Sequence, residues 1–247
     1  MADEPVEWYD ENAVAYSETN TELPIRKWYE WRGVDTLLPD LDGKRVLDAG
    51  CGEGTYTKRL ADRGADVVGV DASDELLGVA REQYGDEIEF HLADLREPLP
   101  FDDASFDVIV TQLALDHIQS WDTALAEFHR VLEPGGHALL SVNNPPAIWA
   151  KMQQDTDDQF GLDRPSYFET ERWEQDWSPM GDAEGTVGFY RRPTTAQLQP
   201  AFDAGFVLDG FEEPQPGEAF RESNPERYAR WSQRPPTFVC YRLRKPE

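Results

Sequence analysis

Residues 45–73 read RVLDAGCGEGTYTKRLADRGADVVGVDAS, and this stretch decides the fold. A short apolar run ends in an acid at Asp48, and glycines then follow at alternate positions. A helical pattern comes next and leads to a second apolar run, which ends in Asp71. This order predicts a βαβ unit with two parallel strands. The turn opens onto a helix N-terminus, where free N–H groups and the helix dipole favour a carboxylate or a phosphate.

The glycines and the second acid together indicate a nucleoside-binding site. Gly50, Gly52 and Gly54 permit positive φ and keep Cβ atoms away from a ligand. Asp71 ends the second strand, where an acid can accept both hydroxyls of a ribose. A glycine turn that serves packing alone is the alternative interpretation.

Details of the turn narrow the choice of nucleoside. A dinucleotide fingerprint needs G-x-G-x-x-G, whereas here Gly54 comes one residue early. Glu53 would also place a negative charge beside a pyrophosphate. Asp48 suits a ligand with a positive group, such as an ammonium. These features favour S-adenosylmethionine, which has a ribose, an ammonium and a carboxylate but no phosphate; a nicotinamide or flavin nucleotide stays the alternative.

The motifs VLDAGCGEG and VVGVDAS resemble the first two motifs of the class I S-adenosylmethionine-dependent methyltransferases. The resemblance runs from about Leu41 to Val142 and is nearest to the ubiquinone/menaquinone-type and related small-molecule enzymes. It implies an α/β fold, with a Rossmann-like, seven-stranded, mostly parallel sheet, helices on both faces and an antiparallel last strand. It also implies in-line methyl transfer from S-adenosylmethionine to a small-molecule acceptor, with S-adenosylhomocysteine as the product. The cofactor-binding residues that it implies are Asp48, Ala49, Gly50, Cys51, Gly52, Gly54, Asp71, Ala72, Ser73, Asp94, Leu95, Thr111 and Gln112.

Four of these residues lie at the carboxyl ends of the third and fourth predicted strands. Asp94 and Leu95 follow the third strand, where the family's acid and the next N–H meet the adenine; a turn-forming loop aspartate is the alternative. Thr111 and Gln112 end the fourth strand and are expected to face the methionine part of the cofactor. His117 comes shortly after them and is the candidate catalytic residue, as a general base on the acceptor. It equally suits a residue that caps a helix or orients the loop.

The resemblance also divides the chain. Residues 1–43 are expected to form a helical segment over the cofactor, with Tyr16 and Arg26 as candidates to contact its methionine end. Residues 44–247 then form the methyltransferase domain. Two insertions are expected, at about 147–192 and about 214–236. The first is rich in aromatic residues and follows the fifth strand, so it predicts a lid over the acceptor pocket, with a small satellite core as the alternative.

Composition limits the function further. The 23 basic and 49 acidic residues give a net charge of −26, with only five lysines, which resembles proteins adapted to high internal salt. An ordinary acidic cytosolic protein is the alternative. This charge argues against a nucleic-acid substrate. The two cysteines and four histidines show no metal-ligand spacing, so no metal is expected. No apolar run suits a membrane span and the N-terminus is not signal-like, which predicts a cytoplasmic protein.

Two other functions stay open. One is a methyltransferase that acts on RNA or protein, against which stand the negative charge and the absence of an amino-methylation signature after the fourth strand. The other is a protein that binds S-adenosylmethionine without chemistry. The sequence does not predict the acceptor, the methylated atom or the oligomeric state.

Overall fold

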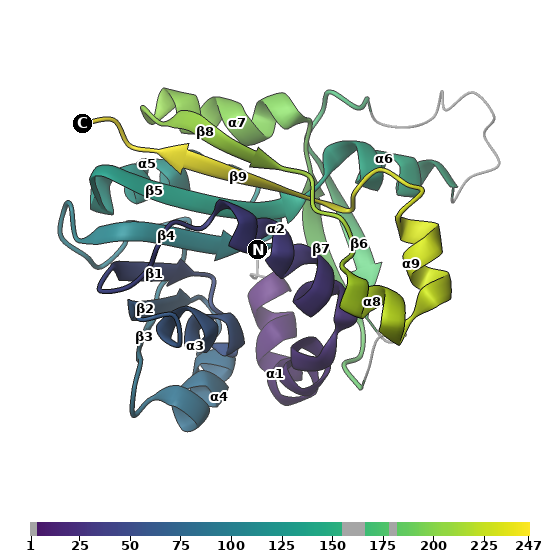
Figure 1. The fold of residues 1–247 in the computed structure, drawn as a ribbon, viewed down its shortest axis with the longest axis horizontal. Helices are drawn as coiled ribbons and strands as arrows, with labels where there is room; N and C mark the ends of the chain where they lie inside the picture. Colours follow the sequence, from purple (N-terminus) through teal and green to yellow (C-terminus); the bar gives the residue numbers. More distant parts are fainter. Residues whose placement is uncertain (1–3, 155–165, 178–181) are drawn as a thin grey trace.

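The computed structural model describes residues 4–154, 166–177 and 182–247 (Figure 1). Its centre is a seven-stranded sheet in the order β3-β2-β1-β4-β5-β9-β8. The strand β9 pairs antiparallel with both β5 and β8, and the pairs among β1 to β5 are parallel. The predicted α/β fold with an antiparallel last strand is therefore confirmed. The strands are β1 (Arg45–Ala49), β2 (Asp66–Asp71), β3 (Glu89–Leu92), β4 (Phe106–Gln112), β5 (Leu132–Asn143), β8 (Val207–Glu212) and β9 (Phe238–Arg244).

Helices cover both faces of this sheet because its central strands are apolar on both sides. On one face, Leu47 and Ile109 pack with residues of α5 and α7, such as Phe128. On the other face, Val46 packs with residues of α2 and α3, such as Leu60. The helix α2 (Trp31–Leu37) precedes the domain. The helices within the domain are α3 (Thr55–Ala61), α4 (Asp74–Tyr84), α5 (Asp122–Val131), α6 (Pro145–Gln154), α7 (Thr194–Asp203), α8 (Glu218–Ser223) and α9 (Pro225–Trp231).

The ends of two helices test predictions about capping. Ser73 caps α4 as its residue type predicts, because its hydroxyl accepts a hydrogen bond from the Leu76 N–H at 3.1 Å. Thr195 also has a residue type that favours an N-cap, but it lies inside α7 instead. The helix α7 begins one residue earlier, at Thr194, with Pro193 in the cap position and no side-chain cap bond.

The N-terminal segment is helical, and it lies against the edge of the domain where the cavity opens. It consists of α1 (Glu4–Glu22), the π-helical turn η1 (Arg26–Glu30) and α2. Trp8 and Tyr16 of α1 join a small apolar cluster with Leu76 of α4. Val187, in the insertion after β5, belongs to the same cluster. Figure 1 shows α1 below the carboxyl ends of the central strands.

The insertion after β5 contains more regular structure than the sequence suggests. It starts with α6, and after an undescribed gap it forms the antiparallel hairpin of β6 (Glu171–Asp176) and β7 (Thr186–Arg191). Phe160, one of the aromatic residues of this insertion, lies outside the described residues. Trp177 and Phe189 join the cluster of α1. The hairpin therefore has the satellite core that the sequence left as an alternative, and it also lines the cavity described below.

Candidate functional site

A cavity of about 730 Å³ lies beyond the carboxyl ends of β1, β2, β4 and β5, between α1, the hairpin and α9. This is where open α/β sheets bind ligands, because strand order reverses between β1 and β4. Of the residues that the sequence predicts for the site, the following line the cavity: Tyr16, Arg26, Asp48, Gly50, Cys51, Gly52, Asp71, Ala72, Ser73, Asp94, Leu95, Gln112 and His117. Ala49, Gly54 and Thr111 do not line it.

The glycine turn shows why three glycines follow β1. All three have positive φ, of 81°, 55° and 81° for Gly50, Gly52 and Gly54. A Cβ on Gly50 would lie 2.2 Å from the Ala114 Cβ, and one on Gly54 would press on α4 and Phe90. Only at Gly52 is the space open, with the nearest atom 4.0 Å away. The turn thus needs glycine for packing at two positions and leaves room for a ligand at the third.

Asp71 supports this turn directly. Its Oδ2 accepts the Gly52 N–H at 2.8 Å, and its Oδ1 accepts the Ser73 N–H at 2.9 Å. Burial raises the pKa of Asp71, while these two bonds act in the opposite direction. Each carboxylate oxygen keeps a further lone pair, so the side chain can still accept two hydroxyls from a ligand.

Asp48 lies deeper, at the end of β1. Its Oδ2 accepts a hydrogen bond of 2.7 Å from the Thr57 hydroxyl. Burial raises the pKa of Asp48 to about 7, and the bond from Thr57 opposes that shift. A positive ligand group beside this carboxyl would favour its charged form. A bound cation would therefore lower the pKa of this carboxyl and favour its loss of a proton.

Asp94 is a bidentate partner of a neighbouring arginine. The Arg96 backbone N–H donates to Asp94 Oδ1 at 2.8 Å, and its guanidinium also contacts both carboxylate oxygens. The side chain therefore has the local bonds of the predicted turn residue and also lies at the cavity wall. Leu95 beside it is buried.

Two buried amides at the cavity wall have atoms without a partner. Gln112 is 7% exposed, and neither its Oε1 nor its Nε2 is hydrogen-bonded within the described residues. Asn20 of α1 donates to Glu53 Oε1 at 2.9 Å, but its own Oδ1 has no partner there. Because a buried unpaired polar atom costs about 1–3 kcal/mol, these atoms indicate a polar ligand that pairs with them. An amino-acid group has both the donors and the acceptors that they need.

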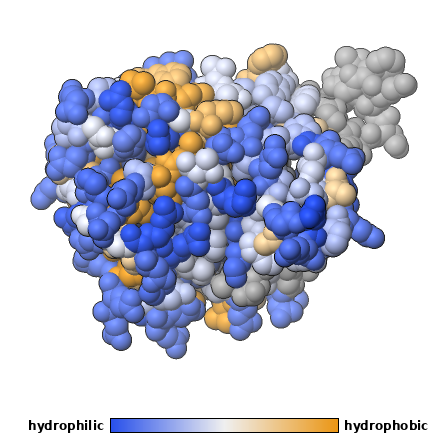
Figure 2. Space-filling model, in the orientation of Figure 1, coloured by the Kyte–Doolittle hydropathy of each residue, from blue (hydrophilic) through white to orange (hydrophobic). Residues whose placement is uncertain are grey.

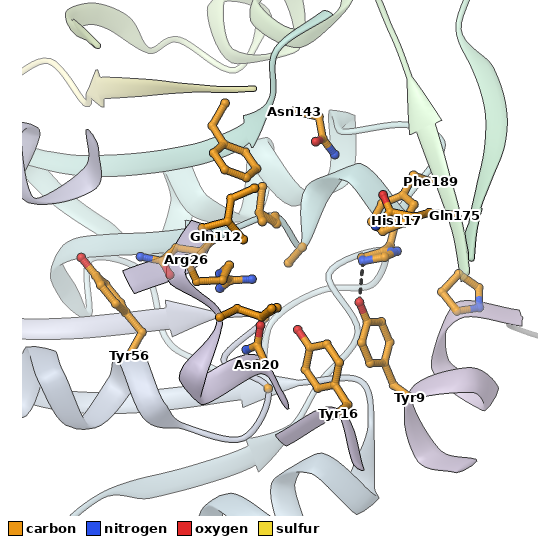
Figure 3. Close-up of a pocket in the computed structure, with 18 of the residues that line it drawn as sticks. Tyr9, Tyr16, Asn20, Arg26, Tyr56, Gln112, His117, Asn143, Gln175 and Phe189 are labelled. Atoms are coloured by element: carbon orange, nitrogen blue, oxygen red, sulfur yellow. Dashed lines mark hydrogen bonds between the residues drawn. The ribbon is translucent and has the colours of Figure 1, made fainter. Parts of the chain in front are cut away.

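Arg26 provides a partly buried cation at the same end. Its Nε lies 3.4 Å from Glu30 Oε2, and the guanidinium lines the cavity. In Figure 3 it lies near Gln112 and Asn20. These residues of α1, η1 and β4 together fit a ligand with a carboxylate and an ammonium. The sequence missed Asn20, because an amide within a helical segment has no motif that identifies it.

His117 has both ring nitrogens engaged. Its Nδ1 lies 2.9 Å from the Gly188 carbonyl oxygen and its Nε2 lies 3.0 Å from the Tyr9 hydroxyl (Figure 3). A carbonyl only accepts, so Nδ1 carries the proton and Nε2 accepts from Tyr9. Burial lowers the pKa of His117 to about 4, so the ring is neutral at pH 7. The residue therefore connects α1, the loop after β4 and the hairpin; the sequence missed Tyr9 as its partner.

Within the described residues, no group of three or more His, Cys, Asp or Glu side chains is placed to hold a metal ion. Over the same residues, every helix is too short or too polar to cross a membrane.

Comparison with known proteins agrees with this geometry. Residues 47–140 match the family model described as a methyltransferase domain. The chain is 36% identical over 143 residues to the demethylmenaquinone methyltransferase of Clavibacter sepedonicus, covering 57% of this chain and 58% of that protein. It is 32% identical over 143 residues to the ubiquinone biosynthesis O-methyltransferase of Dechloromonas aromatica, covering 56% and 58%. The matches thus span about six tenths of these relatives.

A solved structure extends the likeness to nearly the full fold. The S-adenosylmethionine-dependent methyltransferase from Mesorhizobium loti superposes with a TM-score of 0.69 and 27% identity, covering 87% of this chain and 97% of that one. The glycine turn, the strand order and these matches agree with one another. Over residues 47–140 the chain is thus similar to the methyltransferase-domain family, and its fold is similar to that of a solved S-adenosylmethionine-dependent methyltransferase.

Proposed function

We propose that this protein transfers the methyl group of S-adenosylmethionine to a small-molecule acceptor. The observation that carries the proposal is one continuous cavity, which contains the glycine turn, both strand-end acids and the aromatic wall of the hairpin. The curated relatives are named as quinone-pathway methyltransferases, which supports a small-molecule acceptor.

The residues at the cavity wall suit the parts of the cofactor. Asp71 would accept the ribose hydroxyls, and the segment of Asp94 and Leu95 would contact the adenine. Arg26 would bind the carboxylate of the methionine part. Asp48 and the Gln112 amide would pair with its ammonium. These assignments follow from burial and from unpaired atoms, and each gives one part of the ligand a partner of opposite charge or complementary hydrogen bonding.

The reaction itself needs little from the protein beyond positioning. S-Adenosylmethionine supplies an activated methyl group, which bonds to the acceptor's electron pair as the C–S bond breaks and leaves its pair on sulfur. The buried walls hold the reactants in line and exclude water. His117 is neutral and its Nε2 is occupied by Tyr9, which favours an orienting role over that of a general base. An ionisable acceptor would lose its proton to water.

The first test is calorimetric titration with S-adenosylmethionine and S-adenosylhomocysteine. We expect binding by the natural chain and a loss of about 1.5–3 kcal/mol in Asp71→Asn, the usual value of hydrogen bonds to a charged group. Asparagine keeps one acceptor for the backbone of the turn. The matched control is Asp74→Asn, which removes the same charge at an exposed ion pair with Arg81 outside the cavity. Equal affinities in all three proteins would contradict the ribose assignment.

A second measurement separates the functions. The protein is incubated with S-adenosylmethionine labelled in its methyl group and with a cell extract divided by size. Label in the small-molecule fraction supports the proposal. Label in RNA or protein would support the macromolecular alternative, and binding without transfer would indicate a protein without chemistry. The cytoplasmic location stays a prediction from the sequence.

A further inference from the structure

The charged residues at the cavity wall are mixed at one end, where Arg26 and Arg96 line it together with acids, and only basic at the other end. The acids lie at the end formed by β1, β2 and the segment after β3, and the lining residues from position 143 onward include no acid among those described. A stretch of cavity wall without acids is unexpected from the composition, because the chain has 49 acidic residues and only 23 basic ones. The acids that line the cavity are Asp48, Glu53, Asp71 and Asp94, and the cations of the later segments are Lys151, Arg227, Arg230 and Arg234.

Three of these cations lie close together in the sequence and lack acidic partners. Arg227 and Arg230 are in α9, and Arg234 lies a few residues after its end. None of the three forms a salt bridge with a described residue, although all three are exposed at the cavity wall. Elsewhere many arginines have such a partner, as Arg221 does in Glu218 and Arg242 does in Asp209. The three guanidinium groups are therefore available to an anion that enters the cavity.

The helix α9 is fixed to the domain by aromatic packing. Trp231 packs on Phe220 and Tyr29, with ring centroids 5.2 and 5.7 Å apart. The Tyr29 hydroxyl also accepts the Thr237 N–H at 2.9 Å, which fixes the segment after the helix. The Arg227 guanidinium lies over the Trp231 ring at 4.9 Å. These contacts hold α9 and its arginines at one end of the cavity, next to α6 in Figure 1.

Apolar side chains also line the cavity. Ile148 of α6, Phe189 of β7 and Phe238 of β9 line the cavity, and all three are less than a tenth exposed. A ligand that extends from the glycine turn to the arginines shares one cavity with these side chains. Its body is therefore expected to be apolar.

We propose that the methyl acceptor carries an anionic group, a carboxylate or a phosphate, on an apolar body, and that Arg227, Arg230 and Arg234 bind this group. The inference rests on the proposed function and specifies its substrate class. Guanidinium groups match both anions because their planar N–H donors bind two oxygens at once. A neutral acceptor would leave three cations without a partner, and a cationic acceptor would be repelled.

The test measures binding of three probes to protein saturated with S-adenosylhomocysteine at one ionic strength. The probes are 4-phenylbutyrate, 4-phenylbutyl phosphate and 4-phenylbutanol, which share one apolar body. We expect at least one anion to bind about tenfold more tightly than the alcohol. The preferred anion distinguishes a carboxylate from a phosphate. Equal binding of all three probes would overturn the proposal.

A triple variant assigns the effect to the three arginines. Arg227→Gln, Arg230→Gln and Arg234→Gln together are expected to remove the preference for the anion and to leave the alcohol unchanged. The control replaces Arg63, Arg81 and Arg244 by Gln, which changes the net charge equally at exposed ion pairs outside the cavity. A preference that survives the first variant, or that is lost equally in the control, would refute the assignment. Affinity for S-adenosylhomocysteine is measured in each protein, so that failure of the cofactor site is recognised separately.

Discussion

His117 illustrates how burial changes the chemistry of a single residue. An exposed histidine has a pKa near 6.5, whereas this one has a pKa of about 4, because burial disfavours the charged ring. Its position after β4 is predictable from the sequence, but its burial is not. Tyr9, which donates to its Nε2, comes from a helix more than a hundred residues earlier. The tertiary contact thus determines whether the histidine is a base or an orienting group.

The shift predicts a pH dependence of stability. Above pH 6.5 the ring is neutral in both states, so it has no effect. As the pH falls toward 4, the unfolded chain binds a proton that the folded chain does not, and stability decreases. We therefore expect the stability difference between the natural chain and His117→Gln to fall by about 2 kcal/mol from pH 7.5 to pH 5. The measurement is denaturant unfolding at both values.

The two proteins must be compared because other buried groups change the stability with pH in the opposite direction. Burial raises the pKa values of Asp48 and Asp116 to about 7, so the folded state binds protons that the unfolded state does not, and stability rises as the pH falls from 7 to about 4. Both groups are present in both proteins and cancel. A difference that does not change with pH would mean that His117 titrates normally.

At the scale of elements, the glycine turn packs against a neighbouring loop and also lines the cavity. Gly50 packs against Ala114 in the loop after β4, and its φ of 81° suits glycine. We expect Gly50→Ala to cost about 2–4 kcal/mol of stability through strain and overpacking. The measurement is chemical denaturation without ligand, so that packing is tested apart from binding.

The matched control is Gly78→Ala in α4. A Cβ at Gly78 meets no atom within 4 Å, and the residue lies within a helix. We expect this substitution to stabilise the chain by about 0.5–1 kcal/mol through helix propensity. Unchanged stability in Gly50→Ala would indicate that the turn tolerates a side chain and that its glycines serve the ligand alone.

Which elements were predictable depended on how local their signals are. The helix α4 was predictable because its apolar spacing and the Ser73 cap lie within one short segment. The hairpin of β6 and β7 was not, because the burial of Trp177 and Phe189 depends on α1, which is far away in the sequence. The three arginines in and after α9 were not predicted as site residues for the same reason. Only the fold brings them to the cavity.

At the scale of the whole molecule, the surface is dominated by acids. Figure 2 shows a mostly hydrophilic face with a limited hydrophobic band. The 49 acidic residues exceed the 23 basic ones, so many carboxylates have no cation to pair with, and the net charge is −26. Salt weakens the repulsion between these groups and also the surface ion pairs, but such pairs contribute only about 0–1 kcal/mol each. Repulsion should therefore dominate, which makes salt a stabiliser.

We expect the free energy of unfolding to rise by about 3 kcal/mol or more between 0.1 and 2 M KCl, which corresponds to an increase of about 6–12 °C in Tm. The Debye length falls from about 10 Å to about 3 Å by 1 M, so screening accounts for a rise below that concentration. Calorimetry at a series of KCl concentrations measures the effect, and sucrose is the control for stabilisation without screening. A Tm that KCl leaves unchanged would contradict adaptation to salt. A rise with KCl that sucrose does not reproduce would show that charge repulsion limits the stability of this fold in dilute buffer.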